Sequence, residues 1–439
     1  MIYFFYSLLL GLAMLLSSPY WLYQALRHGK YHAGFWERMG RVPKRLGLDS
    51  NSQRVIWLHA VSVGEVLAVS GLVQAMRKRF PEHRIFVSTT TDTGQAVARK
   101  RFGEENVLYF PMDFGFAIRS YLRALRPELI VLAETEFWPN FLRLARVNGA
   151  RIAVVNGRIS DRSWSSYRRF RFALKRMLAQ VDLFLAQTEP DAERLRAIGA
   201  PSERVQVAGN LKFDVPVPAP PAIIEALGAS LAAENAGPVL VCGSTLDGEE
   251  PPLLRAFQNV RAQHPRAVMI LAPRHPERFG EAANLIAETG LPFCRRSQWH
   301  GDQLAGGVLL LDSVGELAAL YVLADLAFVG GSLVRRGGHN IIEPAQYGVA
   351  IVVGPYTQNF RDVVAQFQSR DAIRVVAPSE LGPAFAYLLA HDAERRALGK
   401  RAQETVHSQT GATARTIEAL QRLLANHWAL PSAKAAHNH

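Results

Sequence analysis

His59-Ala-Val-Ser-Val-Gly-Glu65 is the stretch that decides the fold. It follows the apolar run 55–58 and precedes residues 66–79, whose apolar side chains recur at helical spacing before three cations. This order predicts a strand, a tight turn and a helix, the first unit of an α/β domain. Ligands of open α/β sheets bind at the carboxyl ends of the strands, so Glu65 is expected to lie at the active or ligand-binding site. Ser62 and Glu65 also have the spacing of a capping box, and a purely structural role is the alternative.

Length and composition limit the number of domains and the kinds of partner that this protein can have. A chain of 439 residues predicts two or three domains, and 49% hydrophobic with 20% charged residues is ordinary for a globular protein with a membrane segment. The net charge of +12 favours an anionic partner, such as nucleic acid, acidic lipid or a phosphorylated substrate. Cys242 and Cys294 are far apart in the chain and predict reduced thiols in the cytosol rather than a disulfide framework or a zinc site.

The first 26 residues contain no charge and are mostly apolar or aromatic. A helix of that length can cross a hydrocarbon core of about 30 Å, although Ser17-Ser-Pro19 interrupts the run. Arg27 and Lys30 follow and begin an excess of cations, so the positive-inside rule predicts that the body of the protein is cytoplasmic. No cation precedes the run and no cleavage site is evident, which argues against a secretory signal. The alternative is a helix that lies in the membrane interface.

Beyond the N-terminal run, strand-like and helix-like segments alternate in two halves separated by the Pro-rich linker 216–221. This alternation predicts two parallel, doubly wound sheets, and a cleft between two such domains is a preferred place for ligands. The expected strands are 55–58, 84–90, 129–133, 151–156, 183–187 and 205–210, then 238–245, 267–272, 307–312, 326–330 and 350–354. The expected parts are a membrane anchor (1–26), an N-terminal domain (27–215), a C-terminal domain (216–425) and a tail (426–439).

A basic, aromatic stretch is the first candidate binding surface. Residues 159–176 hold six cations and several aromatic side chains. Contact with anionic lipid headgroups is preferred to nucleic-acid binding because a membrane anchor is expected in the same chain, and none of the nucleic-acid module signatures is present. A solvated basic helix face is the alternative.

In the second half, Arg274 and His275 directly follow a predicted strand, and an Arg fork suits phosphate or carboxylate. The turn 312–316 has the same order of strand, small residues, Gly and Glu. The glycine-rich stretch 328–344 allows close approach of a ligand, and its spacing is neither a dinucleotide fingerprint nor a P-loop. Within it, Asn340 is expected to cap the helix while Glu343 binds ribose hydroxyls. The alternative is that the two residues are an N-cap and its reciprocal Glu, whose spacing they have.

Taken together, these stretches resemble the Kdo transferases of lipopolysaccharide synthesis, which move 3-deoxy-D-manno-octulosonic acid (Kdo) from its CMP derivative to a lipid A precursor. The resemblance covers nearly the whole chain. Leu246 and Val314 depart from it, because the family often has His and Met at these positions. The motifs that carry the resemblance are 38–43, 59–65, 134–140, 156–160, 209–214, 243–245, 273–278, 315–316 and 328–340.

The resemblance implies a glycosyltransferase-B (GT-B) fold, with two Rossmann-like domains facing a cleft, and an inverting transfer without metal or cofactor. By resemblance, Glu65 is the general base, and Glu134 and Lys212 assist at the transition state. The partners implied are CMP-Kdo, a lipid A precursor and the inner membrane, with the catalytic domains in the cytoplasm and no nucleic acid. The residues implied to hold the CMP part of the donor are Pro273, Arg274, Val314, Gly315, Glu316, Asn340, Ile342 and Glu343.

Three alternatives remain at this point. Another enzyme of sugar nucleotides, a non-hydrolysing epimerase or a transferase with a UDP donor, fits the two-domain pattern. A catalytically silent lipid- or nucleotide-binding protein also fits it. Retention of Glu65, Glu134, Lys212 and Arg274 together argues against a silent protein.

Overall fold

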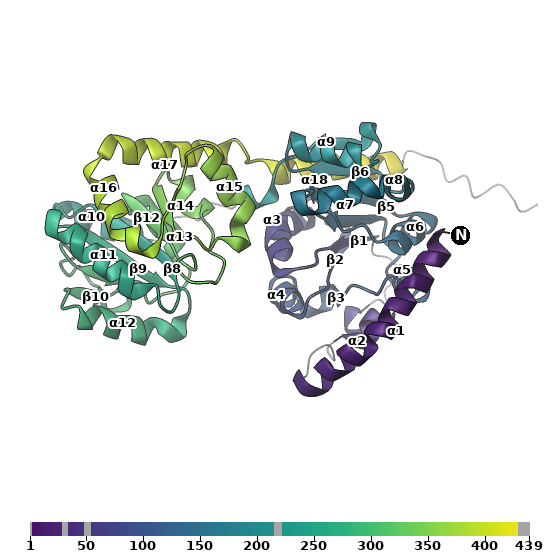
Figure 1. Cartoon of the computed structure of the whole chain (residues 1–439), viewed down its shortest axis with the longest axis horizontal. Helices are drawn as coiled ribbons and strands as arrows, with labels where there is room; N and C mark the ends of the chain where they lie inside the picture. Colours follow the sequence, from purple (N-terminus) through teal and green to yellow (C-terminus); the bar gives the residue numbers. More distant parts are fainter. Residues whose placement is uncertain (1, 29–33, 48–53, 215–221, 429–439) are drawn as a thin grey trace, which may run out of the picture. The chain divides into compact units, whose positions relative to one another are not determined.

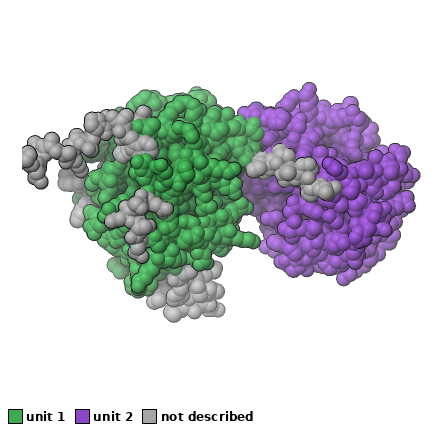
Figure 2. Space-filling model, turned by 180° about the vertical axis from the view of Figure 1, so that it is seen from behind, with its two compact units in different colours: residues 1–214, 410–439 green, residues 215–409 purple. Residues whose placement is uncertain are grey.

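The computed structural model describes residues 2–28, 34–47, 54–214 and 222–428. The chain forms two compact units (Figures 1 and 2). Unit 1 comprises residues 1–214 and 410–439, and unit 2 comprises residues 215–409.

Unit 1 is built on a seven-stranded parallel sheet of order β3-β2-β1-β4-β5-β6-β7 (Figure 1). Its strands are buried almost throughout, because helices cover both faces of a parallel sheet. The predicted doubly wound α/β fold is therefore confirmed for this half. The strands are β1 (Arg54–His59), β2 (His83–Thr89), β3 (Val107–Tyr109), β4 (Leu129–Ala133), β5 (Arg151–Gly157), β6 (Leu183–Ala186) and β7 (Val205–Val207).

Two hydrophobic cores lie on the two faces of this sheet. Side chains of α5, α6, α8 and α9 pack on one face, and side chains of α3, α4 and α18 pack on the other. The α-helices of unit 1 are α1 (Ile2–His28), α2 (Phe35–Arg38), α3 (Val63–Arg79), α4 (Asp92–Phe102), α5 (Gly115–Leu125), α6 (Pro139–Val147), α7 (Asp161–Arg169), α8 (Arg171–Leu178), α9 (Glu189–Ala197) and α18 (Ala412–Trp428). Its short 3-10 helices are η1 (Lys44–Leu46), η2 (Glu104–Asn106), η3 (Ser202–Arg204) and η4 (Leu211–Phe213).

Unit 2 repeats the design with a second seven-stranded parallel sheet, of order β10-β11-β9-β8-β12-β13-β14. Helices α11, α12, α16 and α17 pack on one face and α10 and α13 on the other. The strands are β8 (Val239–Thr245), β9 (Val268–Pro273), β10 (Phe293–Arg295), β11 (Val308–Leu310), β12 (Leu326–Val329), β13 (Ala350–Val353) and β14 (Arg374–Val375). The α-helices are α10 (Ala222–Ala233), α11 (Glu250–Gln263), α12 (Phe279–Glu288), α13 (Leu317–Leu320), α14 (Ile342–Gln346), α15 (Arg361–Ser369), α16 (Leu381–Ala390) and α17 (Asp392–His407). The 3-10 helices are η5 (Pro276–Arg278), η6 (Arg296–Gln298), η7 (Tyr321–Leu323), η8 (Gln358–Phe360) and η9 (Pro378–Glu380).

The N-terminal helix α1 is continuous through the predicted interruption and packs on unit 1. Ser7 Oγ accepts a hydrogen bond from Asn140 Nδ2 of α6 at 2.9 Å, and the Arg143 guanidinium lies 4.8 Å from the centre of the Tyr3 ring. The membrane-spanning anchor predicted for residues 1–26 is not found, since no helix in the described part of the chain has the length and apolar character to cross a bilayer.

The C-terminal helix belongs to unit 1, which corrects the predicted domain boundary of 216–425. Asp214 accepts hydrogen bonds from the backbone N–H groups of Gly411, at 2.7 Å, and of Thr413 at the start of α18. Leu420 and Leu424 are buried against the sheet of unit 1. The predicted tail from 426 is helical as far as Trp428, and the rest of it, like the linker 216–221, lies outside the described residues.

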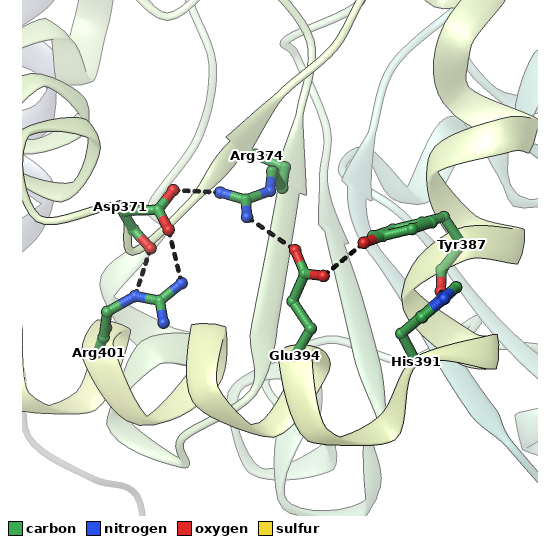
Figure 3. Close-up of polar contacts among 6 residues, drawn as sticks. All are labelled: Asp371, Arg374, Tyr387, His391, Glu394 and Arg401. Carbon is green, nitrogen blue, oxygen red and sulfur yellow. Dashed lines mark hydrogen bonds and ion pairs between the residues drawn. The ribbon is translucent and has the colours of Figure 1, made fainter.

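A charged cluster ties β14 to α17 in unit 2 (Figure 3). Asp371 pairs with Arg374 and with Arg401, the latter at 2.8 Å, and Arg374 continues to Glu394 at 3.1 Å. Tyr387 of α16 donates a hydrogen bond to Glu394 at 2.6 Å. None of these residues is a predicted site residue, and the cluster joins elements at the edge of the sheet.

The contact between Asp214 and α18 can be tested by substitution. Asp214→Ala leaves two backbone N–H groups without their acceptor, and such a loss costs about 1–3 kcal/mol. We expect hydrogen exchange of the α18 amides to accelerate, with a lower free energy of opening. The control is Glu418→Ala on the same helix, whose side chain is 62% exposed. Equal exchange rates in the two variants would contradict the proposed role of Asp214.

Candidate active site

The carboxyl ends of β1 and β4 are adjacent at the centre of the unit 1 sheet. The two strands pair in parallel, with Ile56 opposite Leu129 and His59 opposite Leu132. The chain leaves β1 for α3 on one face of the sheet and leaves β4 for α6 on the other. Such a point of divergence opens a crevice in α/β sheets. Glu65 lies in the first turn of α3 and Glu134 directly follows β4, so both predicted carboxylates are at this point.

Glu65 is held by the start of its own helix. Its Oε2 accepts a hydrogen bond from the Val61 N–H at 2.8 Å, and its Oε1 accepts one from the Ser62 hydroxyl at 3.0 Å. Ser62 is the N-cap residue, and its Oγ accepts a long bond of 3.5 Å from the Glu65 N–H. The predicted capping interaction is therefore present, although the Glu65 carboxylate bonds the amide of Val61 instead of that of Ser62.

The surroundings of Glu65 raise the pKa of its carboxyl group to about 7. Burial is the largest cause, and the negative charges of Glu134 and Glu136 add to it. The bonds from Val61 and Ser62 act in the opposite direction. A half-buried carboxyl group with a pKa near neutrality is suited to accept a proton from a hydroxyl group.

Backbone strain accompanies this site. Glu134 has φ +57°, in the left-handed region that non-glycine residues seldom adopt, and its N–H donates to Val155 O at 2.9 Å. Asn156, near the carboxyl end of the neighbouring strand β5, has φ +55°. Residues in such conformations persist where the surroundings hold them, often at functional sites.

Lys212 lies in η4, a short turn that contacts α3. Two buried Asn side chains shape this turn: Asn156 Oδ1 accepts from the Leu211 N–H and Asn210 Oδ1 accepts from the Lys212 N–H, each at 3.0 Å. Asn156 thus connects the strained end of β5 to the turn that carries Lys212.

The second group of predicted residues gathers at the carboxyl edge of the unit 2 sheet. Arg274 follows β9, and its N–H donates to Thr245 O at the end of β8 at 2.9 Å. The positive charge of Arg274 lowers the pKa of Glu343, although burial, the larger effect, leaves this pKa raised. Burial and the nearby charge of Arg274 lower the pKa of His339 to about 4. Arg274, His339 and Glu343 therefore lie in one electrostatic neighbourhood, with a neutral imidazole beside a cation.

Asn340 and Glu343 contact each other, but not as the predicted N-cap and its reciprocal Glu: the N-cap residue of α14 is Ile341, which has no side-chain cap. Asn340 Oδ1 accepts from the Ile342 N–H at 3.1 Å, and Asn340 Nδ2 donates to Glu343 Oε1 at 3.2 Å. Ile342 is buried at the start of α14. The Asn340 side chain therefore orients the Glu343 carboxylate.

The turn after β11 is also at this edge, since β11 pairs with β9. Val314 is 79% exposed and Gly315 has φ +96°, which only a glycine adopts without strain. Glu316 accepts hydrogen bonds from Ser313 and, at 3.0 Å, from Arg296. The helix that follows has only four residues, so this turn offers side chains and open backbone rather than a long helix terminus.

Two residues of the unit 1 site had no predicted role. Glu136 raises the pKa of Glu65, and Asn156 shapes the Lys212 turn. Both lie within stretches that carried the family resemblance, and a polar residue at a strand end was the signal available. Among the described residues, no group of three or more His, Cys, Asp or Glu side chains is arranged to hold a metal ion.

Two doubly wound units, each with polar groups at the divergence of its central strands, define the GT-B architecture of enzymes that act on nucleotide sugars. MurG of Acinetobacter baumannii is similar in fold, with 13% sequence identity, 84% of this chain and 99% of that chain covered, and a TM-score of 0.53. A UDP-GlcNAc 2-epimerase of Neisseria meningitidis is 12% identical, with 84% and 100% of the two chains covered and a TM-score of 0.51. At these identities, the likenesses show the fold alone.

Sequence comparison gives the family. Residues 33–215 match a family model described as 3-deoxy-D-manno-octulosonic-acid transferase (kdotransferase). The 3-deoxy-D-manno-octulosonic acid transferase of Bordetella pertussis is 36% identical over 433 residues, which cover 94% of this chain and 96% of that protein. A bifunctional glycosyltransferase/methyltransferase of Fusobacterium nucleatum is 36% identical over 75% of this chain, which spans only 52% of that longer protein. This chain belongs to the Kdo transferase family of glycosyltransferases, which decides against the epimerase and the silent binding protein.

The raised pKa of Glu65 predicts the pH dependence of catalysis. Below a pH of about 7 the carboxyl group is mostly protonated and cannot accept a proton, so kcat/KM is expected to fall about tenfold per pH unit. Glu136→Gln removes one negative charge that raises this pKa, and should move the acid inflection to lower pH. Glu82→Gln, at a side chain that is 77% exposed, is the control. An inflection that stays in place in Glu136→Gln would refute this electrostatic account.

Proposed function

We propose that this chain transfers Kdo from CMP-Kdo to a lipid A precursor, lipid IVA, with inversion at the anomeric carbon and in one or more additions. The observation that carries the proposal is the placement of Glu65, a carboxyl group with a pKa of about 7 at the divergence of β1 and β4. Family membership supports this class of donor and a role in lipopolysaccharide synthesis.

In the proposed reaction, Glu65 takes the proton of an acceptor hydroxyl group as its oxygen attacks the anomeric carbon of Kdo. The bond from that carbon to the phosphate oxygen breaks on the opposite face, and CMP departs with the bonding electrons. One displacement inverts the anomeric centre. Glu134 and Lys212 are proposed to act at the transition state, where positive charge develops on the sugar ring and negative charge on the phosphate. No cofactor or metal is part of this proposal.

Unit 2 is proposed to hold the CMP part of the donor. The exposed guanidinium of Arg274 suits the phosphate, because Arg presents a planar fork of donors. The Glu343 carboxylate, already oriented by Asn340, suits ribose hydroxyl groups. The other residues proposed to contact CMP are Pro273, Val314, Gly315, Glu316, Asn340 and Ile342.

We also propose that unit 1 attaches to the cytoplasmic face of the inner membrane, where a lipid acceptor resides. Supporting this, large apolar side chains on the outward face of α1 are 50–73% exposed, and Phe172 of α8 is 91% exposed. The cations around Phe172 are exposed as well, and suit anionic headgroups. The outward side chains of α1 are Phe5, Leu8, Leu9, Leu12, Leu15 and Leu16, and the cations are Arg168, Arg169, Arg171, Lys175 and Arg176.

The transfer itself is tested with purified protein, CMP-Kdo and a tetra-acylated lipid A precursor. Mass spectrometry should show acceptor heavier by one or more Kdo units, with release of CMP. Glu65→Gln should lower kcat at least about 100-fold, because it removes the general base, while CMP affinity measured by calorimetry stays within about twofold. Glu82→Gln is the control for a lost exposed carboxylate. No added mass from folded protein that binds CMP would refute the proposed acceptor.

Membrane attachment is tested by flotation with vesicles. The protein should float with phosphatidylglycerol vesicles more than with phosphatidylcholine vesicles, and Phe172→Ser should reduce the bound fraction, because the exposed ring is the apolar contact within the cationic stretch of α7 and α8. Val322→Ser, at a side chain of unit 2 that is 51% exposed, is the matched control. Equal binding by Phe172→Ser and the unaltered protein would exclude this surface.

A further inference from the structure

Two adjacent carboxylates are fully buried at the start of α11 in unit 2. Glu249 and Glu250 have no exposed surface. Burial of a charge is costly unless hydrogen bonds or an opposite charge compensate it. The groups that bond the two carboxylates therefore show how this cost is compensated and which parts of the fold the carboxylates hold in place.

Glu249 accepts four backbone hydrogen bonds. Its Oε2 accepts from the N–H groups of Leu246, at 2.9 Å, and Gly331, at 2.6 Å. Its Oε1 accepts from the N–H groups of Ser332, at 2.9 Å, and Leu333, at 2.8 Å. Burial raises the pKa of the Glu249 carboxyl group above its ordinary value, and the four hydrogen bonds offset only part of this rise. One donor is in the loop after β8, and the other three are consecutive residues of the loop after β12.

The two loops are neighbours because β8 and β12 pair in parallel at the centre of the sheet. Three consecutive N–H groups that converge on one point form an anion-binding concavity. Gly331, with φ +69°, allows the backbone to curve in this way. Here the anion is the protein's own Glu249 carboxylate. The N–H groups of residues 331–333 are therefore not available to a donor phosphate, which leaves that role to side chains such as Arg274.

The loop that Glu249 holds leads directly to the proposed donor-binding pair. Gly331 O accepts from the Gly338 N–H at 2.8 Å, which closes the glycine-rich segment two residues before Asn340. Ser332 Oγ donates to Val329 O at 2.6 Å and accepts from the Gly354 N–H at 2.8 Å, which fixes the same segment to β12 and β13. A displacement of residues 331–333 would thus be transmitted to Asn340.

Glu250 faces in the other direction. Its Oε1 accepts from Thr245 Oγ1 at 2.8 Å and pairs with Arg278 at 2.6 Å. Thr245 O in turn accepts from the Arg274 N–H. The two carboxylates therefore stabilise neighbouring loops at the carboxyl edge of the sheet. Glu249 holds the loop that leads to Asn340, and Glu250 holds Thr245, which contacts the loop that carries Arg274.

We propose that Glu249 is a positioning residue for the nucleotide-sugar donor: it fills the concavity of residues 331–333 and so fixes Asn340 and Glu343 in the geometry that binds the nucleotide. This inference rests on the proposed function, because it assumes that the donor is held by these residues. Glu249 itself does not touch the donor. Its effect is on donor affinity rather than on the chemical step at Glu65.

The test is Glu249→Gln, which keeps the shape of the side chain and replaces one acceptor oxygen with a donor NH2 group. At least one buried N–H then lacks an acceptor, so we expect the Kd of CMP and the KM of CMP-Kdo to rise at least about tenfold while kcat changes less than about threefold. Hydrogen exchange at the amides of 331–333 should accelerate in parallel. Asp247→Asn is the matched control on the same loop, at a side chain that is 86% exposed, and should leave all three quantities unchanged.

A second variant, Glu249→Asp, keeps the charge and shortens the side chain, and should show a smaller rise in Kd of the same kind. Unchanged CMP affinity and donor KM in folded Glu249→Gln would overturn the inference, as would a failure of unit 2 to fold in both variants, because Glu249 would then serve the fold alone. If unaltered, folded protein fails to bind CMP, the proposed donor site is wrong, and with it this inference. If the unaltered protein binds CMP and the Glu249 variants bind it equally well, the proposed donor site stands and only the role of Glu249 is refuted.

Discussion

The parallel pairing of every strand is the constraint on which both units depend. Because each connection must cross back to the starting edge, the carboxyl ends of all strands in a sheet meet at one edge. In each sheet the first strand is flanked by the next strand of the chain on one side and by a later strand on the other, β1 between β2 and β4, and β8 between β9 and β12. The polar residues at these two points are therefore brought together by topology, although they are far apart in the sequence.

The two central points use the same sequence pattern for different chemistry. After the first strand of each sheet, Gly64-Glu65 lie in the first turn of α3, and Gly248-Glu249 directly precede α11, with Glu249 as its N-cap residue. Glu65 has two donors and lies near two other carboxylates, so its pKa rises to about 7. Glu249 has four backbone donors and is fully buried. The neighbours supplied by the fold, rather than the motif, decide whether the Glu side chain is available for proton transfer.

Interactions within a few residues were predictable from the sequence. The cap of α3 by Ser62 follows from its spacing of three residues from Glu65, and the same spacing brings Asn340 and Glu343 together, although as a bond between side chains and not as a helix cap. The long apolar strands were also predictable. The short strands β3, β10 and β14 were not predicted, although β7 and β11, which are as short as β3 and β10, were, so length alone does not decide which strands a pattern reveals. The charges that raise the pKa of Glu65, and three of the four donors of Glu249, come from residues 69 to 84 positions away, and no local pattern reports them.

The return of the chain from unit 2 to unit 1 makes unit 2 an insertion within unit 1. Helix α18 supplies Leu420 and Leu424 to the core of the first sheet, and its start is fixed by Asp214, the last residue before the insertion. During synthesis on the ribosome, some 200 further residues must therefore be made before α18 can join α3 and α4 on this face of the first sheet. Unit 2, whose residues are contiguous, can complete its core before unit 1 does. The two cores can thus be completed in the reverse of the order in which the two sheets begin.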